Sequence, residues 1–358
     1  MVDFKKTILL AEGPFGDLAE RTYRYLMTSQ EVEGRNVSGG VHKFEDGDLV
    51  VKSFLDREYL PRITRNVRGR DVFLFFPFVK NEGDGLVYEP NRFTELRTIV
   101  DACFRASAST VSLVAPHLPY LRQDRRSNDK ETGEPLREPV SARMVADLII
   151  EMGIDRLLTV TPHFKQFEGF FPGRFRFEGL DARVEFDHHM LTSLNLPREN
   201  NTLWSADLGG GERIKEYARD TGIPFGGLCD KYRPKAGAIS RIRVYKEDDI
   251  NIEGTKPLFV DDMFATCGTI VAAADELRSR GASQEVIAYA VHGILSKGVK
   301  PLRDAGVRPV ITESIPLGLE GVEVVQLHRI IGRAIYSTLT GKSISGTLFN
   351  YERFCKTL

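Results

Sequence analysis

Residues 258–270 read LFVDDMFATCGTI, and this short stretch predicts both a fold and a kind of binding site. Apolar residues lead into the adjacent carboxylates Asp261 and Asp262, and a turn of small and hydroxylic residues follows. The next residues, VAAADELRSRG (271–281), have the apolar spacing of an amphipathic helix. A strand that ends in carboxylates and turns into a helix is typical of the ligand-binding edge of a parallel α/β sheet.

The turn between this strand and this helix suits a phosphate group. Its backbone N–H groups, together with the helix N-terminus, form an anion site, and the neighbouring carboxylates accept hydrogen bonds from sugar hydroxyls. We therefore interpret the segment as a sugar-phosphate site, with the diol on Asp261 and Asp262. The alternative is an ordinary strand–turn–helix corner with a solvated acidic pair. A Walker A loop is excluded, because the chain contains no GxxxxGK[ST].

Strand and helix patterns alternate along most of the chain. The predicted strands 71–78, 110–116 and 155–163 alternate with the predicted helices 91–108 and 141–153, and the alternation resumes after residue 200. This order predicts two similar α/β domains, each with a mainly parallel sheet flanked by helices. Segments 121–139 and 165–200 are rich in charge, proline and glycine, and we expect them to be long loops.

The overall composition is that of a soluble globular enzyme. The 358 residues are 42% hydrophobic and 28% charged, and the formal net charge of −1 provides no basic field for nucleic acid. The four cysteines are scattered and are expected to be free thiols. The apolar run near the start is too short for a signal peptide, and no run is long enough to span a membrane. We therefore expect a cytoplasmic protein without nucleic-acid or membrane partners.

Four further stretches place polar side chains after predicted strands, with plain turns and solvated loops as the alternative interpretation of each. In WSADLGGGERI (204–214) an aspartate precedes three glycines, which allow close approach of a phosphate. PHLPYLRQDRR (116–126) and CDKYRP (229–234) present cations that match phosphates, and VTPHFKQFEGFF (160–171) presents a histidine. The candidate residues are Arg122, Gln123, His163, Asp207, Lys231 and Arg233.

The five stretches occur in the order in which similar motifs occur in ribose-phosphate pyrophosphokinases, the PRPP synthetases. NVRGRDVFL (66–74), REPVSARMVADL (137–148), VHGILSKG (291–298) and TESIP (312–316) also resemble that family, so the resemblance covers nearly the whole chain. It implies two phosphoribosyltransferase-like domains, residues 1–165 with the ATP site and residues 166–334 with the ribose-phosphate site. Residues 335–358 would pack on the first domain, and the chain would form a homo-oligomer, from dimer to hexamer.

The resemblance also implies a reaction and the residues that perform it. The family transfers the β,γ-diphosphate of Mg-ATP to the anomeric hydroxyl of ribose 5-phosphate, giving PRPP and AMP, with Mg²⁺ as the cofactor. The implied catalytic residues are Lys231, Arg233 and His163, and the implied metal ligands are His163 and Asp207. The implied ATP contacts are Phe44, Asp46 and Asp48 from a neighbouring subunit, with Arg122, Gln123 and His163. The implied ribose-phosphate contacts are Asp207, Gly209, Gly210, Asp261, Asp262, Ala265, Thr266, Cys267, Gly268 and Thr269.

The chain departs from the family pattern at several positions. Ala265 and Thr161 stand where the family has aspartates, Asp48 stands where it usually has glutamate, and segments near 50–62 and 172–200 are longer than usual. These departures leave three hypotheses open. The chain makes PRPP, or it transfers the same diphosphate to ADP-ribose, or it is a catalytically silent regulatory homologue. For ADP-ribose, Ala265 would open space beside the 5-phosphate, and the stretch Arg174, Phe175, Arg176 and Phe177 would contact the extra nucleotide.

Overall fold

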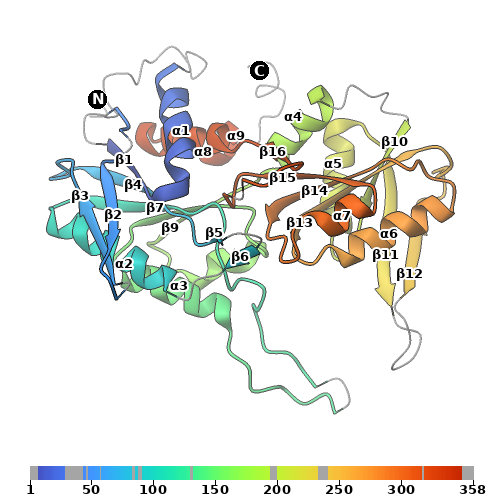
Figure 1. The fold of residues 1–358 in the computed structure, drawn as a ribbon, viewed down its shortest axis with the longest axis horizontal. Helices are drawn as coiled ribbons and strands as arrows, with labels where there is room; N and C mark the ends of the chain where they lie inside the picture. Colours follow the sequence, from blue (N-terminus) through green and yellow to red (C-terminus); the bar gives the residue numbers. More distant parts are fainter. Residues whose placement is uncertain are drawn as a thin grey trace. The chain divides into compact units, whose positions relative to one another are not determined.

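Two mainly parallel sheets organise the chain, one in each of two compact units (Figure 1). The computed structural model describes residues 7–28, 43–45, 47–56, 58–82, 85–87, 91–129, 132–193, 200–232, 241–316 and 318–348. The N-terminal unit comprises Met1–Lys80, Val87–Asp181 and Leu327–Leu358, and the C-terminal unit comprises Asn81–Leu86 and Ala182–Gln326. The predicted fold class is confirmed in both units.

The N-terminal sheet has the strand order β1-β4-β7-β8-β9, and all its neighbours are parallel. Its strands are β1 Thr7–Ala11, β4 Asp71–Phe75, β7 Thr110–Val114, β8 Arg156–Val160 and β9 Arg176–Leu180. The central strands are apolar on both faces because helices cover both. Figure 1 shows α2 (Arg92–Arg105) and α3 (Ser141–Glu151) on one side, and α1 (Gly16–Thr28), α8 (His328–Thr340) and α9 (Ile344–Leu348) on the other.

The expectation of a long loop over 165–200 is wrong. The segment contains a 3-10 helix, Lys165–Phe170, then strand β9 and helix α4 (Arg183–Ser193). Strand β9 pairs with β8 from Arg156↔Arg176 to Val160↔Leu180, so the chain leaves the N-terminal unit after Asp181, not after residue 165. The rings of Phe175 and Phe177 stack on Phe171, with centroids 4.4 and 5.4 Å away, and pack against the core. Burial of these rings stabilises the strand.

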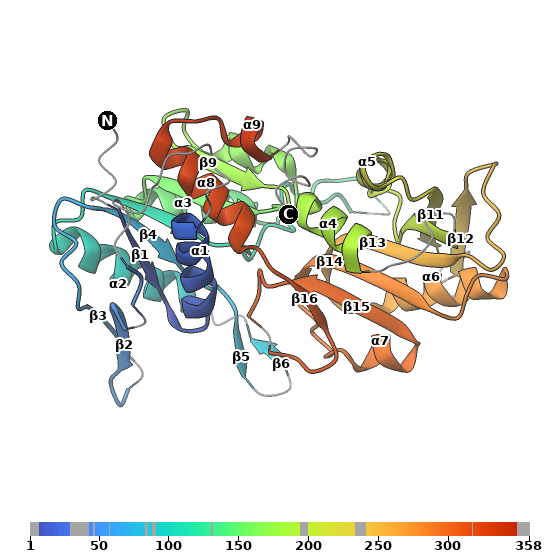
Figure 2. The ribbon, with the colours of Figure 1, turned by 90° about the horizontal axis from the view of Figure 1, so that it is seen from above.

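A hairpin lies beside the N-terminal sheet, and a polar turn leads into its first strand. Strands β2 (Leu49–Ser53) and β3 (Tyr59–Ile63) are antiparallel, and Figure 2 shows the hairpin projecting from this unit. One face of the hairpin packs against the core through Leu49, Val51, Tyr59 and Ile63. A shorter two-stranded sheet joins β5 (Lys80–Glu82) and β6 (Gly85–Val87).

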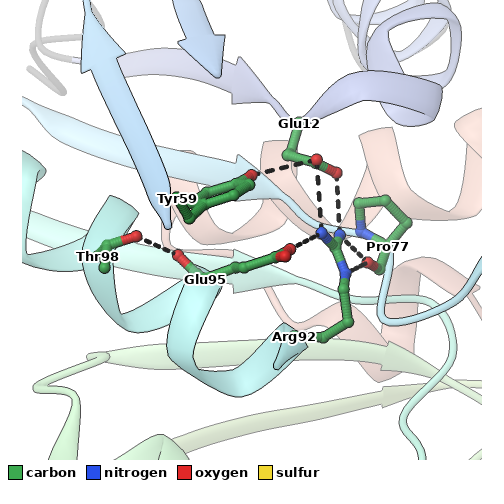
Figure 3. A network of polar contacts seen from close by, with 6 residues as sticks. All are labelled: Glu12, Tyr59, Pro77, Arg92, Glu95 and Thr98. Carbon is green, nitrogen blue, oxygen red and sulfur yellow. Dashed lines mark hydrogen bonds and ion pairs between the residues drawn. The ribbon is translucent and has the colours of Figure 1, made fainter. Parts of the chain in front are cut away.

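A buried ion cluster joins the hairpin to α2 and to the carboxyl end of β1 (Figure 3). Arg92 Nη2 lies 2.9 Å from Glu12 Oε2, Arg92 Nη1 pairs with Glu95, and Arg92 Nε donates to the Pro77 carbonyl at 2.9 Å. The Tyr59 hydroxyl donates to Glu12 Oε1 at 3.2 Å. The Arg92 side chain is only 1% exposed, and pairing and hydrogen bonding offset the cost of its burial.

The C-terminal sheet has the order β12-β11-β10-β13-β14-β15-β16 and is parallel except at its first pair. Its strands are β10 Asn201–Ser205, β11 Phe225–Tyr232, β12 Arg241–Lys246, β13 Lys256–Phe264, β14 Val286–Gly293, β15 Val307–Thr312 and β16 Glu323–Val325. The accompanying helices are α4, α5 (Gly211–Thr221), α6 (Gly268–Ser279) and α7 (Lys300–Asp304). Among the helices described, none combines the length and the apolar composition that a membrane crossing requires.

Candidate functional site

The acidic residues of the C-terminal unit gather at the carboxyl edge of its sheet. Strands β10 and β13 are parallel neighbours with Trp204 opposite Phe259, so Asp207, just after β10, and the pair Asp261–Asp262, near the end of β13, lie toward the same edge of the sheet. We expected β13 to end at the acidic pair. It continues to Phe264, alongside β14. The acidic pair therefore lies beyond the ladder between β10 and β13, which ends at the pairing of Trp204 with Phe259.

Arg213 contacts both carboxylates of the pair; it lies in the quoted stretch 204–214 but was not among the predicted site residues. It extends from the first turn of α5, and its Nη1 lies 3.4 Å from an oxygen of Asp261 and 3.4 Å from an oxygen of Asp262. Burial, Asp262 and Asp207 raise the pKa of Asp261 well above its usual range, although Arg213 acts in the opposite direction. The carboxyl group of Asp261 therefore keeps its proton to a higher pH than an ordinary aspartate does.

The glycine-rich turn after β10 holds Asp207 in place. Gly210 N–H donates to Asp207 Oδ1 at 2.8 Å, and Asp207 N–H donates to Ser205 Oγ at 3.3 Å. A Cβ atom at Gly210 would lie 2.2 Å from Ser205 Oγ, so this position accepts only glycine without a shift. Asp207 itself is exposed, and one of its oxygens is fixed by the turn while its carboxylate faces solvent.

The turn after β13 is held by hydrogen bonds from the segment that follows β14. Leu295 N–H donates to the Phe264 carbonyl at 2.8 Å, and Ser296 donates to the Ala265 carbonyl through its N–H at 3.0 Å and its hydroxyl at 3.1 Å. Because a trans peptide points its C=O and N–H in opposite directions, the N–H of Thr266 faces away from Ser296. The turn thus directs a backbone donor to the side opposite Ser296.

The start of helix α6 is open to a ligand. A Cβ atom built on Gly268 would meet nothing within 4 Å, and Thr266 is exposed. Cys267 takes the left-handed conformation, with φ of 60°, immediately before the helix. Burial raises the pKa of its thiol to about 11, so Cys267 has a structural role in the turn and is not a thiolate. The free N–H groups of this helix start favour an anion.

In the N-terminal unit, the predicted ATP segments also share a sheet edge. The loops after β7 and β8 begin side by side, because Val160 N–H donates to the Pro116 carbonyl at 3.0 Å. Arg122 and His163 are exposed on these loops. The Gln123 amide donates to Glu138 at 3.4 Å, and the same carboxylate accepts the Ser127 N–H at 3.0 Å, which ties the arginine-rich loop together.

Thr161, which stands where the family has an aspartate, has an unusual backbone. Its φ is 38°, a left-handed value for a β-branched residue that also precedes a proline. Its N–H donates to the Leu180 carbonyl of β9 at 2.7 Å. A backbone hydrogen bond from strand β9 therefore holds Thr161, two residues before His163.

Several predicted site residues differ from expectation or lie outside the described residues. Asp46 and Arg233 lie outside them. Lys231 lies within β11, opposite Ile242 of β12, and not after a strand. Phe44 and Asp48 are buried, at 8% and 7% exposure, and their assignment to ATP stays a prediction.

The sequence and the fold match one group of known proteins. Residues 17–153 match the family model for the N-terminal domain of ribose phosphate pyrophosphokinase. A ribose-phosphate pyrophosphokinase from Cereibacter sphaeroides is 33% identical over 307 residues, which cover 83% of this chain and 84% of that protein. One from Neisseria meningitidis is 32% identical over 347 residues, covering 94% and 92%. The crystal structure of phosphoribosylpyrophosphate synthetase from Mycobacterium smegmatis superposes with a TM-score of 0.73 and 25% identity, covering 94% of this chain and 100% of that one.

Proposed function

The chain belongs to the ribose-phosphate pyrophosphokinase family and is a diphosphotransferase, and from that premise we propose that it makes PRPP. In the proposed reaction the anomeric hydroxyl oxygen of ribose 5-phosphate attacks the β-phosphorus of ATP. The bond from the β-phosphorus to the α,β-bridging oxygen breaks, AMP leaves with that oxygen, and the hydroxyl proton passes to solvent. The observation that carries this proposal is the acidic pair Asp261–Asp262, shared with Arg213, beside the open N-terminus of α6.

We assign the sugar phosphate to the C-terminal unit. Asp261 and Asp262 accept hydrogen bonds from the ribose diol, and the crowding of carboxylates at this edge favours a ligand that brings hydroxyl donors. The 5-phosphate lies in the turn of residues 265–269, against the backbone N–H groups that Ser296 orients from behind. Binding both ends of the sugar fixes the anomeric hydroxyl for in-line attack.

We assign ATP to the N-terminal unit, with Arg122, Gln123 and His163 on the loops that share its sheet edge. Diphosphoryl transfer needs positioning and cations more than covalent participation by the protein. Lys231, exposed on β11, and Arg233 supply positive charge to the transferring group. Loss of such a cation removes charge stabilisation from the transition state and lowers kcat.

The implied Mg²⁺ fits Asp207 better than His163. Mg²⁺ prefers oxygen ligands and retains several waters, and Asp207 is an exposed carboxylate held by its own turn. An imidazole suits softer metals, so we assign His163 to the ATP phosphates. When bound, the metal neutralises phosphate charge during transfer.

ADP-ribose is the second candidate acceptor, and Ala265 favours it. The alanine removes a carboxylate from the turn where the 5-phosphate of an ester would continue into a second nucleotide. The other argument for ADP-ribose is weaker than the sequence suggested, because Phe175 and Phe177 pack against the core of the N-terminal unit. We therefore place ribose 5-phosphate first.

One experiment tests both acceptors. Purified protein receives Mg-ATP with ribose 5-phosphate or with ADP-ribose, while AMP and the diphosphorylated product are followed by mass spectrometry. AMP with ribose 5-phosphate supports the proposal, and AMP only with ADP-ribose replaces it with the second candidate. No AMP with either acceptor, from folded protein that binds ATP, overturns both and leaves the regulatory role.

The variant Ala265→Asp separates the two acceptors further. For ribose 5-phosphate the added carboxylate restores the family pattern, and activity should remain or rise. For ADP-ribose it crowds the ester, and turnover should fall. The control is Ala272→Asp, on α6 beyond its first turn, which should leave the ratio of the two activities unchanged.

A further inference from the structure

The end of the C-terminal sheet carries a group of arginine and tyrosine side chains on one face. Strand β12 is the last strand of this sheet and pairs antiparallel with β11 (Figure 1). Arg241 lies opposite Tyr232 in this register, and Arg243 lies opposite Asp230. Opposed residues share a face and successive residues alternate between faces, so these side chains and that of Tyr245 lie on the same face. We call Arg241, Arg243, Tyr232 and Tyr245 the arginine strip.

Two tyrosines hold the Arg243 side chain in place. Its guanidinium carbon lies 4.5 Å from the centroid of the Tyr232 ring, which is its diagonal neighbour on β11. Its Nη1 donates to the Tyr245 hydroxyl oxygen at 3.2 Å. The ring face attracts the cation, and a guanidinium that is already held loses less freedom when a ligand binds. Arg243 is therefore arranged in advance for a ligand, although it is exposed.

The positive charge of the strip is not neutralised by a neighbouring carboxylate. Within the part of the chain that the structure describes, neither Arg241 nor Arg243 forms an ion pair. Asp230 lies directly across from Arg243, yet the guanidinium stacks on tyrosine instead. Exposed arginines on the helices differ, as in the pairing of Arg105 with Asp101 one turn away. Two adjacent cations without a counter-charge attract an anion.

The strip lies at the ligand-binding edge of the sheet but on the other face from Lys231. Strand β11 runs parallel to β10 with Leu228 opposite Ser205, so Tyr232 extends to the carboxyl edge, where open α/β sheets bind ligands. Lys231 lies opposite Ile242 and therefore points to the opposite face of the strand pair. The strip is thus separate from the cation that we assign to the transferring diphosphate.

We propose that the arginine strip binds a polyphosphate anion, at a site apart from the reacting centre of the proposed function. Arg241 and Arg243 are two residues apart on one face, about 7 Å between Cα atoms, so both forks reach linked phosphate groups. Guanidinium forks match phosphate oxygens with two parallel hydrogen bonds. The Tyr245 hydroxyl accepts from Arg243 and keeps its own hydrogen for the ligand. The polyphosphate is either a free inorganic ion or part of a nucleotide.

The test counts the pyrophosphate ions that each chain binds, by equilibrium dialysis with radiolabelled pyrophosphate. Mg²⁺ is left out, because the reaction at the reacting centre requires it. We expect the double variant Arg241→Gln/Arg243→Gln to bind one ion fewer per chain than the wild type, with the remaining sites unchanged. Arg243→Gln alone should weaken the lost site roughly tenfold, because a hydrogen bond to a charged group is removed. Equal counts and affinities in the wild type and the double variant would overturn the inference.

Two further variants separate a built site from a general positive field. Tyr232→Leu keeps every charge but removes the ring that holds Arg243, so we expect roughly two- to fivefold weaker binding. Lys246→Gln removes an exposed cation from the same strand but from the other face, opposite Gly227, and should bind as the wild type does. Equal losses from Lys246→Gln and Arg243→Gln would mean that only the field matters, which overturns the inference.

Protection of the sheet edge is the other explanation of the two arginines. Charged side chains on an edge strand also prevent its pairing with other chains. A double variant that self-associates in sedimentation runs but binds pyrophosphate as the wild type does would establish that role and overturn ours.

A parallel titration with cytidine diphosphate identifies the source of the polyphosphate. A site that the double variant loses for both ligands accepts the phosphates of a nucleotide, and a site lost for pyrophosphate alone is selective for the free ion. Both results support the strip as a polyphosphate site. Because the site does not depend on the proposed reaction, failure to release AMP would overturn the proposed function only.

Discussion

Charged side chains at the carboxyl edges of the two sheets differ in how deeply they are buried and how closely they pair. In the N-terminal unit, Arg92 is fully buried and pairs closely with Glu12 and Glu95, and carbonyl bonds complete its hydrogen bonding. In the C-terminal unit, Arg213 is one-third exposed and reaches Asp261 and Asp262 only at 3.4 Å. The carboxyl edge is closed by a buried ion cluster in one unit, whereas in the other unit it holds crowded carboxyl groups with only distant contacts to an arginine.

From this difference we infer that the N-terminal edge contributes to stability and the C-terminal edge to ligand binding. A closed ion cluster has no donor or acceptor to offer a ligand, and its loss exposes the fold to an uncompensated charge. A crowded acidic edge is unfavourable by itself and becomes favourable when hydroxyl donors or a cation arrive. We therefore expect substitutions at the first edge to change unfolding and substitutions at the second edge to change activity.

The largest expected effect is on stability, from Arg92→Met. Removal of the guanidinium leaves Glu12 and Glu95 buried without their partner, which costs about 3–5 kcal/mol. The first unfolding midpoint should fall by about 10 °C, since 1 kcal/mol shifts the midpoint of a chain this long by roughly 2–4 °C. Calorimetric scans of the wild type and the variant measure the shift.

The matched substitution is Arg213→Met, in the other unit. Its contacts are long and its own side chain is one-third exposed, so we expect a smaller loss of unfolding free energy than from Arg92→Met. Equal losses from both substitutions would contradict the distinction between the two edges.

The next largest effect is on catalysis, from Asp262→Asn. The amide keeps the shape of the side chain but removes the charge that strengthens hydrogen bonds from the sugar diol. We expect kcat/KM for the acceptor to fall about 100-fold, which corresponds to about 2.7 kcal/mol. Steady-state rates of AMP release measure this fall, and ATP affinity should not change.

The exposed Asp304, paired with Lys300 on α7, provides the control for that substitution. Asp304→Asn should leave kcat/KM and the unfolding midpoint at wild-type values. A wild-type kcat/KM in Asp262→Asn would remove the acidic pair from the acceptor site.

The central strands of both sheets could be predicted because their apolar residues need helices on both faces. Strand β9 could not, because RFEGL mixes charged and apolar residues and follows a proline and a glycine. It pairs at the sheet edge, where only Leu180 is fully buried, Arg176 is exposed and Glu178 pairs with Arg156 of β8. An edge strand has a weak sequence pattern for this reason. The tertiary packing of Phe175 and Phe177 favours a strand here over a loop.

The site could be predicted where one chain segment or two parallel strands define it. Asp207 and Asp261 share an edge because β10 and β13 are parallel, which follows from the alternation of elements. Arg213 depends on how α5 lies over the sheet, and the pairing of Arg65 with Asp48 depends on the hairpin register. These contacts require three-dimensional positions that motif spacing does not contain.

A third prediction concerns the pH dependence of stability, which we attribute to a partly buried histidine. His328, at the start of α8, packs edge-on against Tyr25 of α1, with ring centroids 6.3 Å apart. Burial, Arg21 and Arg329 lower its pKa to about 4 from an ordinary value of 6.5. The unfolded chain therefore takes up a proton more readily, and stability is lost as the pH falls from 6.5 toward 4.

The variant His328→Gln isolates this contribution. Between pH 7.5 and pH 5 the unfolding midpoint of the wild type should fall about 2–4 °C more than that of the variant, which is roughly 1 kcal/mol, because the ring is only partly buried. Midpoints measured at both pH values give the difference. The opposite sign would mean that His328 binds its proton more tightly in the folded chain.

The smallest expected effect is on the KM for the acceptor, and it tests how the turn after β13 is held. Ser296→Ala removes the hydroxyl that donates to the Ala265 carbonyl at 3.1 Å but keeps the N–H that donates to the same oxygen at 3.0 Å. One of two bonds remains, so the Thr266 N–H keeps its direction but is held less firmly. A single such bond contributes about 0.5–1.5 kcal/mol, and we expect the KM for the acceptor to rise roughly two- to tenfold with kcat little changed.

Ser279→Ala is the matched control, because its hydroxyl donates to the Glu276 carbonyl at 2.7 Å at the far end of α6. It loses the same kind of bond away from the turn and should leave the KM at its wild-type value. A fall in kcat with an unchanged KM in Ser296→Ala would mean that the hydroxyl acts on the transferring diphosphate. In that case the crowded edge of the C-terminal unit would extend to Ser296, and the turn would be part of the reacting centre instead of only an anchor for the sugar phosphate.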